Sequence, residues 1–107
     1  ISHRDIKPEK VVIVKNKYKV NYFGDSIVLS KGKTEQQVRG TELFMSPLVY
    51  AAYREQRNLV HDSFKSDVYS LGMCFLMAAT LEMFTLIEFR DFKDSKSRLS
   101  FIKSWKY

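Results

Sequence analysis

The sequence has little cysteine, proline or glycine. Its 107 residues include one cysteine, two prolines and four glycines. The single cysteine, Cys74, excludes a disulfide framework, and together with only two histidines it excludes a Cys/His zinc site. Because apolar residues make up 45% of the chain, a disordered or low-complexity protein is also excluded. These features predict a folded protein from a reducing, intracellular compartment, and we expect it to be cytoplasmic.

The sequence also lacks a long hydrophobic run. Its longest uncharged apolar stretch, residues 68–81, is 14 residues long, whereas a bilayer-spanning helix needs about 20. The chain starts at Ile1 without a charged region leading into an apolar one, so no signal peptide is predicted. Its length allows one compact unit at most. We therefore expect a soluble protein that does not contact a membrane, or a piece of one.

Positive charge is concentrated in the first part of the chain. Residues 1–40 contain nine Lys/Arg and four Asp/Glu, a balance of +5, whereas residues 41–107 contain nine and eight, a balance of +1. A basic segment fits either a phosphate or acidic partner or a solvated surface. The aromatic residues of the basic segment, Tyr18, Tyr22 and Phe23, are not interleaved with basic ones as in RNA-binding motifs, so nucleic acid is not favoured.

The first half of the chain predicts a β-hairpin followed by a loop. Residues 11–14 form a β-branched run, and residues 18–23 form a second strand-like run after a polar turn. Residues 24–47 are polar and rich in turn-forming residues, without a periodic apolar pattern. They are predicted to form one long loop, and loops of this length are usually functional or disordered.

The second half of the chain predicts helices. Ser66 or Asp67 could open a helix that is apolar on nearly all sides and is therefore expected to be buried on most faces. Residues 88–107 carry apolar residues at spacings of three and predict one more amphipathic helix. The predicted fold class is mainly α with a short β-hairpin.

Four short motifs follow one another between residues 2 and 80. They read HRDIKPE at 3–9, YFG at 22–24, GTELFMSP at 40–47 and KSDVYSLG at 65–72. In this order and at these separations they resemble the protein kinase family, from the catalytic loop and the DFG position through the activation segment to the central helix. Lys7 and Thr41 resemble the serine/threonine branch of that family.

The resemblance implies part of the C-terminal lobe of a protein kinase. In this interpretation residues 1–23 are the catalytic loop and hairpin, residues 24–47 the activation segment and residues 48–107 the helical part of the lobe. The N-terminal lobe and the end of the C-terminal lobe are expected to be absent. The family uses ATP and Mg²⁺ to phosphorylate a protein substrate, so these cofactors and a protein substrate or regulatory partner are implied. The oligomeric state stays open.

The resemblance also assigns roles to the catalytic-loop residues. Asp5 would accept or orient the proton of the substrate hydroxyl, and Lys7 would reach the transferred phosphate. Arg4 would pair with a phosphorylated residue of the activation segment, because a guanidinium binds phosphate in a bidentate manner.

Structural roles are implied for the other motif residues. His3 and Phe23 would pack beneath the site, with Gly24 completing the motif that Phe23 belongs to. Thr41 follows the glycine of the activation-segment motif, and Asp67 would accept hydrogen bonds from the backbone of the catalytic loop.

Two residues depart from the family pattern at the metal-ligand positions. Lys10 stands where the catalytic loop supplies a metal-binding asparagine, and Tyr22 stands where the DFG motif supplies an aspartate. Mg²⁺ requires hard oxygen ligands, so an ammonium at one position and a phenol at the other remove both of the family's side-chain ligands to the metal. The sequence therefore predicts no metal ligands at these positions and a catalytically impaired, pseudokinase-like chain.

Two alternatives stay open at this point. In the first, the chain belongs to a longer, active kinase in which Asn21 or Asp25 provides unconventional metal binding. In the second, it is an interaction module whose basic residues 1–40 contact an acidic protein or nucleic acid.

Overall fold

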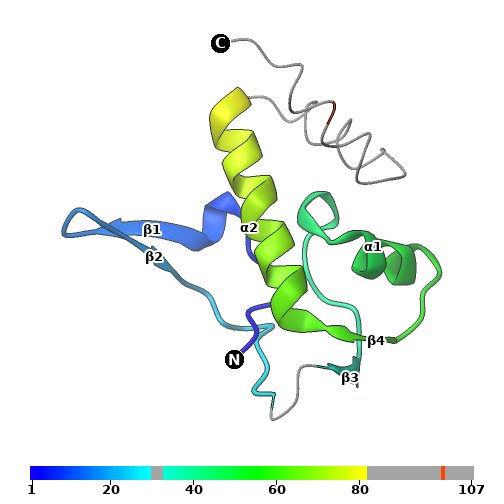
Figure 1. The fold of residues 1–107 in the computed structure, drawn as a ribbon. Coiled ribbons are helices and arrows are strands. Elements are labelled where there is room, and N and C mark those ends of the chain that lie inside the picture. Colours follow the sequence, from blue (N-terminus) through cyan, green and yellow to red (C-terminus); the bar gives the residue numbers. More distant parts are fainter. Residues whose placement is uncertain (30–32, 82–99, 101–107) are drawn as a thin grey trace.

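A computed structural model of the chain describes residues 1–29, 33–81 and Ser100 (Figure 1). The predicted helix over residues 88–107 lies outside the described residues, apart from Ser100. The elements in chain order are the 3₁₀ helix η1 (Pro8–Lys10), β1 (Val11–Val14), β2 (Lys17–Val20), β3 (Lys33–Gln36), the 3₁₀ helix η2 (Glu42–Phe44), α1 (Pro47–Arg54), β4 (Leu59–Asp62) and α2 (Ser63–Thr80).

The prediction of a mainly α fold is wrong. The described residues form two α-helices and two antiparallel two-stranded sheets, one of β1 and β2 and the other of β3 and β4. The second sheet was missed because β3 lies in the predicted loop and reads Lys-Thr-Glu-Gln, which has no apolar alternation. Its backbone is ordered by pairing with a distant segment, in a register that aligns Lys33 with Asp62 and Gln36 with Leu59.

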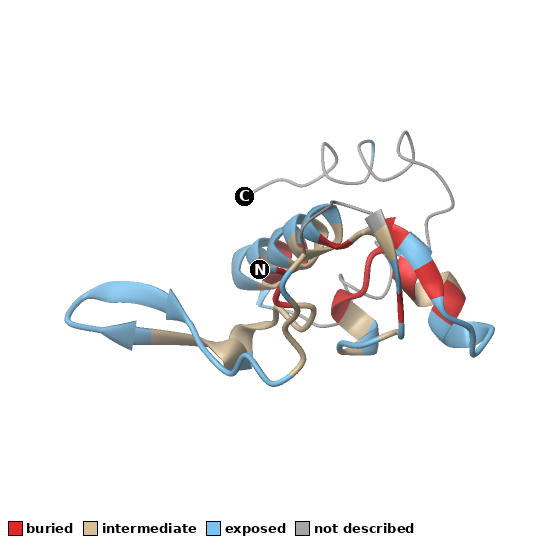
Figure 2. Cartoon of the chain, turned by 90° about the horizontal axis from the view of Figure 1, so that it is seen from below, coloured by how far each residue is buried: buried red, intermediate tan, exposed pale blue. Residues whose placement is uncertain are grey.

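The predicted hairpin is confirmed, with a shorter second strand. β1 and β2 pair from Val11 with Val20 to Val14 with Lys17. The connecting residues Lys15 and Asn16 both have positive φ, 50° and 62°, as in the two-residue turn whose twist matches that of the flanking strands. The hairpin extends away from the rest of the molecule, and much of it is exposed (Figures 1 and 2).

Helix α2 begins earlier than predicted because Asp62 caps it. The Asp62 carboxylate accepts hydrogen bonds from the backbone N–H groups of Phe64 (3.1 Å) and Lys65 (3.4 Å), which have no partner within the helix. The helix ends at Thr80, where Leu81 turns into the left-handed region with φ 57°. No helix among the described residues is long and apolar enough to cross a membrane.

Two small clusters form the core of the described residues. One joins η2 to α2 through Phe44, Met73, Cys74 and Leu76. The other joins α1 to β4 through Met45, Val49, Ala52 and Leu59. Burial raises the pKa of the Cys74 thiol to about 11, so this cysteine stays protonated at neutral pH and is a core residue.

Helix α2 is buried on one side only, which corrects the prediction of burial on most faces. Its other side carries an apolar stripe of exposed residues at helical spacing, defined here as the α2 stripe: Phe64, Val68, Leu71 and Phe75. These positions are four, three and four residues apart and therefore share one helix face. Val68 and Phe75 are 69% and 66% exposed, so the described part of the chain leaves this face largely uncovered.

Candidate functional site

Asp67 of α2 holds the start of the catalytic-loop motif. Its Oδ2 accepts hydrogen bonds from the Ser2 hydroxyl (2.9 Å) and the His3 backbone N–H (2.7 Å), and its Oδ1 accepts one from the Arg4 backbone N–H (2.8 Å). Ser2 is fully buried, and Arg4 has a left-handed backbone with φ 69°. One carboxylate thus joins residues more than 60 positions apart in the sequence.

His3 lies beneath the loop with a defined tautomer. Its Nδ1 accepts a hydrogen bond from the Asp5 backbone N–H (3.1 Å), so its Nε2 carries the proton and donates to the Asn21 carbonyl (2.9 Å). The Phe23 ring meets the imidazole edge-on, with the ring centroids 5.2 Å apart. A Cβ added to Gly24 would meet nothing within 4 Å.

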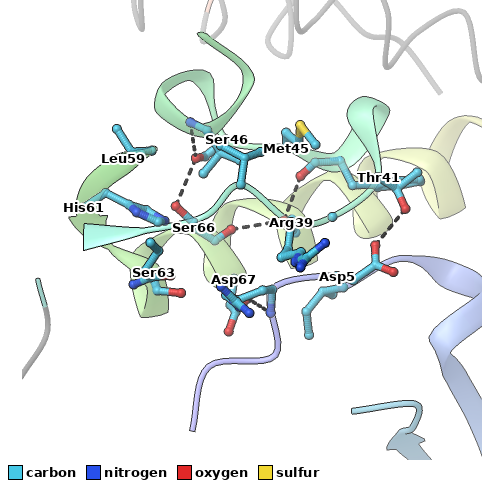
Figure 3. Close-up of a pocket in the computed structure, with 18 of the residues that line it drawn as sticks. Asp5, Arg39, Thr41, Met45, Ser46, Leu59, His61, Ser63, Ser66 and Asp67 are labelled. Atoms are coloured by element: carbon cyan, nitrogen blue, oxygen red, sulfur yellow. Dashed lines mark hydrogen bonds between the residues drawn. The ribbon is translucent and has the colours of Figure 1, made fainter. Parts of the chain in front are cut away.

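The Asp5 carboxylate lies at the centre of the motif and is largely enclosed. Its Oδ1 accepts a hydrogen bond from the Thr41 hydroxyl (2.7 Å), and the two side chains face each other in Figure 3. Its Oδ2 lies 3.5 Å from the Lys10 ammonium and 4.0 Å from the Lys7 ammonium. The Asp5 side chain is only 10% exposed, and those of the two lysines are 22–23% exposed.

The two residues that depart from the family pattern contact each other. The Lys10 ammonium lies 5.1 Å from the centroid of the Tyr22 ring, within the range of a cation–π interaction. Tyr22 has a left-handed backbone with φ 59°, and its N–H donates to the Asn21 side-chain oxygen (2.8 Å). Within residues 1–29 and 33–81, no group of three or more His, Cys, Asp or Glu side chains is arranged to hold a metal ion.

Arg4 joins the catalytic loop to the segment before Thr41. Its Nε donates to the Asp25 carbonyl (2.6 Å) and one terminal nitrogen to the Gln37 carbonyl (3.4 Å), while Arg39 donates to the Gln37 side-chain oxygen (2.9 Å). Burial lowers the pKa of Arg4, and the nearby Arg39 guanidinium acts in the same direction. Gln37 was not singled out from the sequence, because nothing in its local pattern marks a residue that contacts two arginines.

Gly40 brings the same segment against the catalytic loop. A Cβ at this position would lie 2.8 Å from the Arg4 carbonyl oxygen, and the φ of Gly40 is +120°. Both the contact and the backbone conformation therefore require glycine. This close approach places Thr41 within hydrogen-bonding distance of Asp5.

A small cavity lies between the catalytic loop, the segment 36–41 and the start of α2 (Figure 3). Its volume is about 30 Å³, which is enough for one or two water molecules. Arg4, Asp5 and Asp67 line it on one side, and Gln36 and His61 from the second sheet line it on another. The cavity is too small for a nucleotide and is a packing feature of the site.

The buried His61 should make the free energy of unfolding depend on pH. Burial lowers its pKa from 6.5, helped by Arg4, whereas the Leu59 backbone, Asp62 and Asp67 act in the opposite direction. Because the unfolded chain binds this proton more readily, the free energy of unfolding should decrease as the pH falls through about 6.5. His61→Gln should flatten this dependence in urea denaturation between about pH 5 and 7.5. An unchanged pH profile in the variant would contradict the assignment.

Comparison with known proteins shows which family the chain resembles. The family model of the protein kinase domain matches residues 1–102. A probable serine/threonine-protein kinase of Dictyostelium discoideum is 33% identical over 104 residues, and this alignment covers 90% of the chain and 15% of that protein. The testis-specific serine/threonine-protein kinase 3 of Mus musculus is 33% identical over 73 residues, and an Aurora kinase of Eremothecium gossypii is 36% identical over 74.

Each of the latter two alignments covers 68% of the chain, and 26% and 18% of the respective relatives. The chain thus spans about a quarter or less of the length of these relatives. The match of the family model, which includes all four motifs, confirms the resemblance drawn from them. The chain belongs to the protein kinase family.

Proposed function

We propose that the chain is part of a serine/threonine-type protein kinase domain in which phosphotransfer is impaired, so that it acts as a pseudokinase-like module. Residues 1–23 supply the catalytic loop and hairpin, residues 24–47 the activation segment and residues 48–107 the helical part of the lobe. The observation that carries this proposal is the Lys10 ammonium 3.5 Å from the Asp5 carboxylate, at a position where the family places a metal ligand.

The residues around Asp5 do not fit Mg²⁺. This ion prefers carboxylate, carbonyl and water oxygens in octahedral geometry. Lys10 brings a positive charge to one ligand position, and Tyr22 brings a neutral phenol to the other. The Asn21 side-chain oxygen already accepts a hydrogen bond from the Tyr22 N–H, so it would have to be freed before it could bind a metal. We therefore derive no step through Mg²⁺.

The contacts of Asp5 also argue against efficient proton transfer. In the proposed arrangement Asp5 would orient the hydroxyl of a protein substrate, and Lys7 would contact the transferred phosphate. Asp5 is instead engaged by the Thr41 hydroxyl and lies near two ammonium groups. A substrate hydroxyl would have to displace the Thr41 hydroxyl or enter between the two ammonium groups to reach an Asp5 oxygen.

Radiolabelled phosphate transfer from ATP to protein substrates tests the proposal. The chain should give no incorporation above that of its Asp5→Asn variant, with either Mg²⁺ or Mn²⁺ present. Incorporation that requires Asp5 would contradict impaired catalysis. If Asn21→Ala or Asp25→Ala also abolished that activity, the alternative of unconventional metal binding would be supported.

A further inference from the structure

Lys10 and Tyr22 form a unit that the family pattern does not contain. Lys10 ends η1, and Tyr22 follows β2, so the hairpin brings them together. The aromatic face of Tyr22 holds the Lys10 ammonium beside Asp5, through a cation–π contact of 5.1 Å. A fixed positive charge therefore lies where the family uses a divalent ion.

This cluster has more positive than negative charge. Lys7 and Lys10 both lie next to one oxygen of Asp5, at 4.0 Å and 3.5 Å. These separations exceed the usual N–H···O hydrogen-bond range of about 2.7–3.2 Å, so the pairing is loose. An ammonium has three donors, and the other Asp5 oxygen is already engaged by the Thr41 hydroxyl. The two lysines thus retain donors and one unit of uncompensated charge.

Partial burial makes this charge more effective. With 22–23% of their side chains exposed, the ammonium groups interact with an anion in a less polar surrounding than on an open surface. A phosphate chain offers several oxygens that can accept hydrogen bonds from both lysines. The Lys10 ammonium also lies over the Tyr22 ring, so less of the Lys10 side-chain freedom is lost on binding.

We propose that Lys7 and Lys10 form a metal-independent binding site for a polyphosphate group, in which the Lys10 ammonium supplies the charge that a divalent cation would otherwise supply. The inference rests on the proposed function, since it explains what the impaired site still binds. The ligand class is a phosphate chain, either free or as part of a nucleotide.

Calorimetric titration of the full chain with tripolyphosphate and with ATP, each in EDTA and in Mg²⁺, tests this proposal. Both probes should bind in EDTA, and added Mg²⁺ should not tighten binding. Equal affinities for tripolyphosphate and ATP would show that the phosphate chain alone is recognised. Tighter binding of ATP would show that the site also contacts the nucleoside. Absence of binding in EDTA, or a requirement for Mg²⁺, would overturn the proposal.

Matched variants separate the site from general basic charge. Lys10→Gln should weaken tripolyphosphate binding about 10- to 100-fold, as expected for a charge-assisted hydrogen bond. Lys19→Gln removes the same charge from an exposed position of β2 and should change the affinity little. Equal losses in the two variants would show that the basic surface binds without a specific site, and the proposal would fail.

Two further variants keep the test valid if Lys10→Gln does not fold. Lys10→Arg preserves the charge and should retain metal-independent binding, whereas Tyr22→Leu removes the aromatic ring beside Lys10 and should weaken binding about 2- to 5-fold. If neither expectation holds, the assignment is wrong. Failure of the proposed function is distinguishable, because it appears as Asp5-dependent phosphate transfer and not as a change in binding in EDTA.

Discussion

Replacing Asp67 with alanine should abolish the folded arrangement of the catalytic loop. The carboxylate accepts three hydrogen bonds from Ser2, His3 and Arg4. Its removal leaves the His3 and Arg4 backbone N–H groups without this partner, whereas the Ser2 hydroxyl keeps its contact with the Ser63 hydroxyl. At about 1–3 kcal/mol for each of these two unsatisfied N–H groups, the expected loss is about 2–6 kcal/mol. Whole domains are stable by only about 5–15 kcal/mol. Urea denaturation and hydrogen exchange of residues 2–5 would measure the effect.

Asp62→Ala is the matched control for Asp67→Ala. It also removes a carboxylate from the beginning of α2, but Asp62 accepts its two hydrogen bonds from exposed backbone N–H groups at the helix start. Loss of such a cap typically costs about 0.5–2 kcal/mol. If the two variants lose equal stability, Asp67 acts as a helix-terminal charge and not as the link between α2 and the catalytic loop.

The 107-residue chain on its own should bind hydrophobic dyes and self-associate through the α2 stripe. Burying a large apolar side chain contributes about 1.5–3 kcal/mol, and the stripe has four such side chains that are partly or largely exposed. If half of the burial free energy of these four side chains is still available, association would gain about 3–6 kcal/mol. This gain corresponds to roughly a 100- to 10,000-fold change in the affinity of self-association. Sedimentation velocity and dye fluorescence would detect both effects.

Substitutions in the α2 stripe distinguish association through this exposed surface from association that results from poor folding. Val68→Lys combined with Phe75→Lys should give a monomer with reduced dye binding and an unchanged helix content. Val60→Lys, at an exposed position of β4 (63%), is the matched control and should leave association unchanged. A wild-type chain that is monomeric and does not bind dye would contradict the prediction.

The structure also refines which residues of α2 should be poorly protected in the chain alone. The apolar run at residues 75–77 does not by itself distinguish Phe75, Leu76 and Met77 by burial. In the structure Phe75 is 66% exposed, whereas Leu76 belongs to the core cluster with Met73 and Cys74. Slow hydrogen exchange through residues 70–80 together with a cooperative thermal transition would show that this cluster is sufficient to hold the helix.

The sequence by itself determined the family, the hairpin and the two unusual residues at the metal-ligand positions. The motifs are local strings, so they can be identified without knowing what they contact. The β-branched run at residues 11–14 and the polar turn after it specify a hairpin through neighbouring residues alone. Lys10 and Tyr22 were likewise visible as departures, because the resemblance fixes which residue types the positions should hold.

Tertiary structure alone decided the second sheet, the exposed side of α2 and the arrangement around Asp5. β3 has a polar sequence and is a strand because β4 pairs with it. The apolar residues of α2 divide into a buried and an exposed side according to which other elements are present to cover them. The contacts of Lys10 with Asp5 and Tyr22 depend on how the hairpin folds back on the catalytic loop. Such contacts between separated residues leave no local pattern, because their free energy is gained only when the chain has folded.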